Sequence, residues 1–322
     1  MISASRVTAL EGSWRGLGGY ATAMLAVLIF ASYPVATRAD VTGAFKPDDL
    51  VLLRFGIAAL LFLPYMAFRF RQLSGNTWRA GATLSVYQGA GMAGLVVCGL
   101  QFAPASHAAA LGPGAAPAWA ALFGYLIFSR RQSSWHVAGA ALIAFGAVTL
   151  IRVGTSGALP EFILGDVMFL GASALGALYF LRLRDSGIGV LAGAALVSFY
   201  SIAAIIVWYL TTRSVPFSGL RTSQLLWQIL WQGVLIGFIA LIALNHAISS
   251  LGGERASTLM ALVPVTSMVL GSVFLAEIPT GAEWVASSVI SLGVAIASVQ
   301  AGRPAVSSAR AKISACGLSR PG

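Results

Sequence analysis

Long apolar runs separated by short polar segments fill most of this sequence. Residues 80–129, 222–253 and 256–276 contain no Asp, Glu, Lys or Arg. An α-helix needs roughly 20 residues to cross the hydrocarbon core of a bilayer, and each of these runs is long enough. The pattern predicts an all-α integral membrane protein with ten transmembrane helices. We place them at about residues 17–37, 48–68, 79–101, 104–128, 134–151, 164–183, 188–210, 224–247, 255–276 and 283–301.

The two ends of the chain are polar. The first apolar run follows Arg6 and Arg15 and extends to Arg38. It is longer than the roughly 7–15 residues of a signal-peptide core, so we expect a first helix that is retained. The tail, residues 303–322, is rich in Ser, Ala and basic residues and is predicted to be a disordered cytoplasmic segment.

The composition excludes an ordinary soluble protein. Apolar residues make up 58% and charged residues 9% of the chain, against about 45–50% and about 25% in soluble domains. A net charge of +10 could suggest nucleic acid as a partner, but the basic residues occur singly or in pairs between apolar runs. The lipid bilayer is therefore the expected partner, and nucleic acid is not. Cys98 and Cys316 have no metal-ligand spacing, and we predict no metal and no cofactor.

The distribution of Lys and Arg predicts the orientation. With ten helices and both termini cytoplasmic, fourteen basic residues fall in cytoplasmic segments and five in outer ones, while Arg54 lies within a helix. The outer five are Arg38, Lys46, Arg152, Arg213 and Arg221. The positive-inside rule then supports this topology.

Internal similarity predicts a duplication. Tyr33 aligns with Tyr179 at an offset of 146 residues, Pro113 with Pro264 at 151, and Gly146 with Gly293 at 147. We expect a first repeat at 1–151 and a second at 152–302, each with five helices. An odd number of helices inverts the second repeat, and inverted repeats are typical of transporters that alternate between two conformations. A purely structural duplication remains the alternative.

Three prolines predict broken helices. Pro113 and Pro117 interrupt the fourth predicted helix, and Pro264 interrupts the ninth. Proline removes a backbone donor, and the carbonyls it frees must meet protein groups or water inside a membrane. Matching breaks in two repeats favour a binding region, and simple kinks for packing are the alternative.

Polar and aromatic side chains within the predicted helices are the candidates for contact with a substrate. Such groups face protein or water, so each could bind a neighbouring helix instead. Tyr33 and Tyr179 are either paired gates or interfacial anchors. The remaining candidates are Tyr87, Gln88, Ser106, His107, Trp119, Ser173, Asn245, His246, Ser257 and Thr258.

Two ionisable residues have two interpretations each. His107 could bind substrate or a proton, or it could bond to a backbone carbonyl. Arg54, about two turns into its helix, could attract a substrate carboxylate, or it could extend to the interface or bond to a loop. We find no Asp or Glu deep in the helices. This argues against export of lipophilic cations by proton exchange and favours a neutral or zwitterionic solute.

Motifs spread along residues 17–301 resemble a known family. They are the run Phe30–Arg38, the pair Arg54-Phe55, Gly165-Asp166, the stretch from Arg255 through Pro264 to Glu277, and Gly293-Val294. This series is similar to the drug/metabolite transporter superfamily in its ten-helix EamA-type branch. Phe128-Ser129 departs from the pattern, since the first repeat lacks an acid equivalent to Glu277.

The resemblance implies a bacterial inner-membrane exporter, and the YddG-type amino-acid exporters are the subgroup it suggests. It also implies a central cavity lined by helices 1, 3, 4, 6, 8 and 9. We expect export of neutral or aromatic amino acids or similar metabolites by alternating access, from a monomer or weak homodimer that has no enzymatic activity.

Other functions stay open at this point. A nucleotide sugar or phosphorylated solute would need several basic cavity residues, whereas only Arg54 is available within the helices. An intramembrane hydrolase would use Ser173 and His246 as nucleophile and base. A channel or a receptor is a further alternative.

Overall fold

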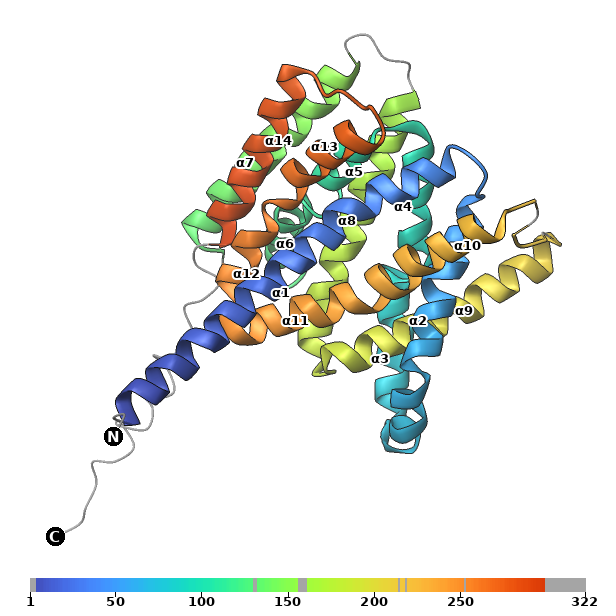
Figure 1. Cartoon of the computed structure of the whole chain (residues 1–322), viewed down its shortest axis with the longest axis horizontal. Coiled ribbons are helices and arrows are strands. Elements are labelled where there is room, and N and C mark those ends of the chain that lie inside the picture. The colour runs from blue at the N-terminus through green and yellow to red at the C-terminus, as the bar shows by residue number, and fades with distance from the viewer. Residues whose placement is uncertain are drawn as a thin grey trace.

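A computed structural model describes residues 4–129, 132–155, 161–213, 215–217, 219–251 and 253–298. The described residues form helices and connecting turns (Figure 1). The helices are α1 (Ala4–Val41), α2 (Pro47–Arg69), the 3₁₀ turn η1 (Phe70–Gln72), α3 (Gly75–Gln88), α4 (Ala90–Phe102), α5 (Ala105–Leu111), α6 (Ala116–Leu126), α7 (Ser134–Thr155), α8 (Glu161–Ser186), α9 (Val190–Thr212), α10 (Thr222–Gln228), the π-helix η2 (Ile229–Ile239), α11 (Ala240–Leu251), α12 (Gly253–Met260), α13 (Val263–Phe274) and α14 (Gly281–Ser298).

Nine stretches of the described chain are long and apolar enough to cross a membrane. They overlap nine of the ten predicted ranges, which confirms a multi-pass membrane protein. The predicted helix at 104–128 is instead divided into α5 and α6, each too short to span alone. The count of ten therefore stays a prediction. The expected tail at 303–322 lies outside the described residues.

Interruptions occur inside several spans. The predicted helix at 79–101 is divided at Gly89, where an added Cβ would lie 2.2 Å from the Ser85 carbonyl oxygen. Only glycine fits so close an approach of the backbone. The hydroxyl of Ser201 on α9 accepts the Ala90 N–H at 3.2 Å and so satisfies one donor freed by the break.

Small residues allow the backbones of α7 and α14 to pack closely. A Cβ added to Gly139 would lie 2.5 Å from the backbone nitrogen of Ala297 and 2.6 Å from the carbonyl oxygen of Gly293. A Cβ added to Gly146 would similarly meet the backbone of α14. The two helices run side by side (Figure 1). Backbones can approach this closely only where side chains are absent.

The other main contacts connect segments far apart in the sequence. The long helix α1 packs along α11, α4 packs against α8, and α2 packs against η2 and α9 (Figure 1). Glycine again allows close approach, at Gly99 and Gly165 between α4 and α8 and at Gly233 of η2 against Ile57. The result is a helix bundle in which polar side chains of α1 face several partners.

Candidate solute-transport site

The carboxyl end of α1 is bound to three other segments by one cluster of polar contacts. The Arg38 guanidinium donates to the Glu277 carboxylate and to the carbonyl oxygens of Leu100 at 2.6 Å and Ala103 at 2.8 Å. The other Glu277 oxygen accepts the Ala105 N–H at 3.1 Å. We name these residues the Arg38–Glu277 cluster. Its hydrogen bonds connect α1, the end of α4, the start of α5 and the segment after α13.

A second cluster lies close by in the sequence, around His107 on α5. Nδ1 of His107 lies 2.8 Å from Asp166 on α8, and Nε2 lies 3.3 Å from Glu283 on α14. His107 is fully buried and Asp166 is 1% exposed. A neutral imidazole carries one N–H, so bonding to both acids requires a second proton on the imidazole or on a carboxyl group. We name these three residues the His107 triad.

The prediction about His107 is resolved in part by this geometry. Its partners are carboxylates on two other helices rather than a backbone carbonyl. Asp166, expected near a helix end, is buried within the bundle, and its Oδ2 atom has no partner among the described residues. The triad therefore links α5, α8 and α14 through the two ring nitrogens of His107.

The part of α1 that precedes Arg38 carries a polar face. The Arg54 guanidinium on α2 donates to the Tyr33 hydroxyl at 2.9 Å and lies 5.1 Å from the centroid of the Tyr33 ring. One turn further along, the Thr37 hydroxyl donates to the Tyr33 carbonyl at 2.7 Å and accepts from the Gln232 amide at 2.8 Å. Arg54 thus contacts a neighbouring helix, not a loop or the interface.

The next turn of α1 contacts a second glutamine. The Gln228 amide nitrogen donates to the Asp40 carboxylate and to the Ala36 carbonyl oxygen at 3.2 Å. Gln228 and Gln232 are both fully buried. Their Oε1 atoms have no hydrogen-bond partner among the described residues. Two buried acceptors are therefore left without donors.

The predicted gate residue Tyr179 lies far along the chain from this face and is buried. Its hydroxyl would be 3.5 Å from a Cβ added to Gly193 of α9, and its ring contacts Phe180 edge to face. Ser173, on the same helix α8, donates to the Gly112 carbonyl at 2.6 Å. It therefore satisfies a carbonyl at the break between α5 and α6, and its hydroxyl hydrogen is not offered to a base.

Other predicted residues are spread over several elements. Tyr87 packs against the main core, Trp119 stacks on Phe123, and Ser106 is buried. Gln88 ends α3 at the Gly89 break, and its Oε1 atom is buried without a partner among the described residues.

The candidates on α11 and α12 do not gather with the others. His246 is exposed and lies 3.1 Å from the Thr22 hydroxyl of α1. Ser257 and Thr258 are also exposed. The side chain of Asn245 lies outside the described residues.

The prolines mark the breaks as expected. Pro117 and Pro264 are each the second residue of the helix that follows a break, α6 and α13. Pro113 lies exposed in the turn between α5 and α6. Pro117, rather than Pro113, therefore occupies the same position in its helix as Pro264.

Sequence reasoning missed Gln228, Gln232 and Ser201. The two glutamines lie four residues apart in a run without charged residues, a spacing that places them on one helix face. That signal could have identified them. Ser201 gave no comparable signal, because its partner is a backbone N–H at a break that was not predicted.

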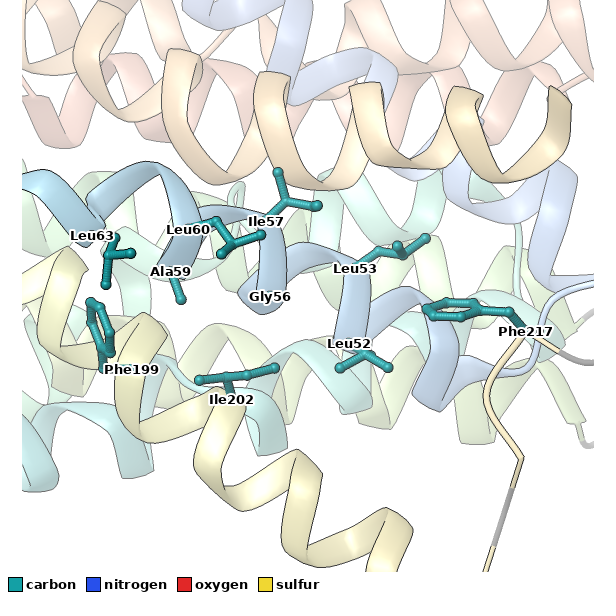
Figure 2. A pocket seen from close by; sticks show the side chains of 10 residues that line it. All are labelled: Leu52, Leu53, Gly56, Ile57, Ala59, Leu60, Leu63, Phe199, Ile202 and Phe217. Carbon is teal, nitrogen blue, oxygen red and sulfur yellow. The ribbon is translucent and has the colours of Figure 1, made fainter. Parts of the chain in front are cut away.

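The described surface also carries an apolar pocket of about 450 Å³ between α2 and α9 (Figure 2). It is lined by Leu52, Leu53, Gly56, Ile57, Ala59, Leu60, Leu63, Phe199, Ile202 and Phe217. A polar solute needs convergent polar groups, and this pocket offers none. It is therefore not the candidate transport site.

Comparison with known proteins shows similarity to one family over part of the chain and a shared fold over most of it. Residues 17–152 match the EamA-like transporter family. A crystal structure of another protein aligns with a TM-score of 0.59 and 22% identity, covering 90% of this chain and 100% of its own; this likeness shows a shared fold. No curated protein matches the chain. This multi-pass membrane protein is therefore similar, over residues 17–152, to the EamA-like transporter family.

Proposed function

We propose that the protein is a secondary transporter that exports amino acids, neutral or aromatic ones first, across a bacterial inner membrane by alternating access. The match to a transporter family over residues 17–152 supports a role in moving small solutes. No covalent chemistry enters this proposal.

The Arg38–Glu277 cluster is the observation that carries the proposal. It fastens a helix of the first predicted repeat to the segment after α13 in the second. Its bonds are polar and reversible, and both charged side chains keep some exposure, 18% and 21%. Alternating access needs one end of the bundle closed by contacts that can separate, and the predicted topology makes this the outer end.

Corresponding helix positions support an inverted repeat. Gly75 and Thr222 begin α3 and α10, and Ser134 and Gly281 begin α7 and α14, each pair 147 residues apart. Ser129 with φ 48° and Ala276 with φ 54° are likewise 147 residues apart and follow α6 and α13. A non-glycine residue with positive φ is uncommon, so its recurrence at this offset favours a duplication.

The tyrosine gates form part of the proposal. Tyr33 precedes Arg38 on α1 and contacts Arg54, and Tyr179 is buried in α8. We expect Tyr179→Ala to loosen the inner end and change the rate or the sidedness of transport. Unchanged transport in both directions would remove Tyr179 from the mechanism.

Uptake into liposomes that hold the purified protein tests the proposed function. A panel of radiolabelled amino acids is compared with empty liposomes, and unlabelled members are added as competitors. We expect saturable uptake of neutral or aromatic members. Collapsing an imposed pH gradient with an ionophore shows whether uptake is coupled to protons.

The panel also contains a phosphorylated sugar and a nucleotide sugar. Uptake of these solutes without uptake of any amino acid, by protein that elutes as a folded species, would overturn the proposed substrate class. Absence of uptake for every solute would overturn the transport proposal for this panel, and single-channel recording would then be the next measurement.

A further inference from the structure

Arg54 is a cation within a membrane-spanning helix, and no described acid forms an ion pair with it. Among the described residues, Arg38 pairs with Glu277, whereas the contacts of Arg54 are the Tyr33 hydroxyl and the rings of Tyr33 and Phe55. A charge inside a membrane protein is costly and is retained where it pairs or serves the transported solute. The guanidinium has five N–H donors, and one donates to Tyr33.

The chemistry around the two glutamines fixes which amide atom is free. Thr37 gives its hydroxyl hydrogen to the Tyr33 carbonyl, so it can only accept from Gln232. Gln228 faces a carbonyl and a carboxylate, which are also acceptors. Both glutamines must therefore present their NH₂ groups to α1. Their oxygens are the atoms left over, and both are buried without a donor in the described chain.

Arg54 and the two glutamines contact successive turns of α1. Arg54 contacts Tyr33, and Gln232 contacts Thr37 one turn later on the same face of α1. Four residues along an α-helix rise about 6 Å, so Tyr33 and Thr37 are separated by about that distance along α1. A carboxylate and an ammonium on one carbon, each held by a hydrogen bond of about 2.9 Å, match a separation of this size.

We propose that Arg54 binds the carboxylate of an amino-acid substrate and that the amide oxygens of Gln228 and Gln232 accept its ammonium group. This inference rests on the proposed function and names the recognition chemistry of its site. Tyr33 bonds Arg54 while the site is empty and releases it to the substrate. Asp40, held by Gln228, adds negative charge on the ammonium side.

Apolar neighbours define the remainder of the substrate. Tyr33 packs against an apolar cluster formed by Ile29 of α1, Ile236 of η2 and Ala240 of α11. This surface accepts an apolar side chain. The site therefore favours neutral and aromatic amino acids by burying their side chains.

Competition experiments with substrate analogues test the two contacts separately. Labelled L-phenylalanine is bound to purified protein in detergent, so binding is measured without translocation. L-Alanine replaces it if phenylalanine is not taken up in the liposome assay. Unlabelled competitors are the amino acid, its amide, which lacks the carboxylate, and the amine-free acid, 3-phenylpropionate or propionate.

In the wild-type protein, loss of either group should weaken competition about tenfold to a hundredfold, the range for a hydrogen bond to a charged group. Arg54→Gln should weaken binding of the amino acid by that factor and leave binding of the amide unchanged. Gln232→Leu should weaken the amino acid and the amide equally and leave the amine-free acid unchanged. Arg71→Gln, an exposed arginine in η1, is the matched control and should change nothing.

Arg54→Lys keeps the charge and should retain part of the preference for the amino acid over its amide. This variant tests the carboxylate contact if Arg54→Gln does not fold. If Arg54→Gln weakens the acid and the amide equally, Arg54 only supports Tyr33 and the inference is wrong. The same holds if the acid-over-amide preference is unchanged in Arg54→Gln. If the wild-type protein transports and binds no amino acid, the proposed function fails first and this inference fails with it.

Discussion

Replacing Glu277 by Gln should open the end of the bundle that the Arg38–Glu277 cluster closes. The substitution keeps an oxygen to accept the Ala105 N–H but removes the negative charge that Arg38 meets. The Arg38 contacts with the carbonyls of Leu100 and Ala103 can persist. The loss is therefore confined to one charge-assisted interaction.

The magnitude follows from the exposure of the pair. A hydrogen bond to a charged group contributes about 1.5–3 kcal/mol, and partial exposure reduces this because water screens the charges. With Arg38 18% and Glu277 21% exposed, we take about 1–2 kcal/mol. That changes the ratio of closed to open molecules about five- to thirtyfold.

Hydrogen–deuterium exchange with mass spectrometry measures this ratio directly. The N-terminal amides of α5 and the C-terminal part of α4 should exchange faster in Glu277→Gln by the same factor, because they exchange only when that end opens. Glu161→Gln, which removes an exposed acid at the start of α8, is the matched control. Equal exchange in Glu277→Gln and the wild-type protein would show that the cluster does not hold this end closed.

Three further substitutions test the packing and the buried polar contacts. Gly139→Ala should lower the unfolding temperature in detergent, since its Cβ would lie 2.5 Å from the α14 backbone and overpacking costs about 1–3 kcal/mol. Gly94→Ala, with open space around it, should leave the unfolding temperature unchanged. An equal decrease of the unfolding temperature in both variants would contradict the close contact at Gly139. Ser173→Ala should cost about 1–3 kcal/mol because it leaves a buried carbonyl unpaired at the α5–α6 break, and unchanged thermal unfolding would show that water replaces the hydroxyl. His107→Leu should cost about 3–5 kcal/mol by stranding the buried Asp166 carboxylate. Adding Asp166→Asn should then recover part of that loss, and no recovery would show that the cavity, not the charge, is responsible.

Much of the fold could be predicted because each span carries its own signal. Runs without charge at helix length are a local property, so nine spans were placed within a few residues of the observed ones. Pro117 and Pro264 marked breaks for the same reason, since proline disrupts the helix at its own position.

The features that were missed depend on partners distant in sequence. The first helix was expected to end at residue 37 and continues to Val41, where Arg38 meets an acid 239 residues away. The break at Gly89 leaves a donor that only Ser201 on α9 satisfies. Neither pairing has a signature within one helix, and the chain must fold before these groups meet.

The candidate site was only partly predictable. Tyr33 and Arg54 could each be identified as candidates from the sequence, because an aromatic or charged residue is conspicuous in an apolar run. Their contact, and the orientation of Gln228 and Gln232 toward α1, depend on how α2 and η2 pack. Ser257 and Thr258 were candidates because they are polar residues within a predicted helix, and both side chains are exposed.

Direct backbone contact between α7 and α14 also bears on electrical insulation. A membrane protein that conducted protons while idle would dissipate the gradients on which its host depends. At Gly139 and Gly293 the two backbones leave no space for a Cβ, and therefore none for a file of water molecules. Protons cross membranes along water and polar side chains. The contact between α7 and α14 is therefore closed to water at these two positions.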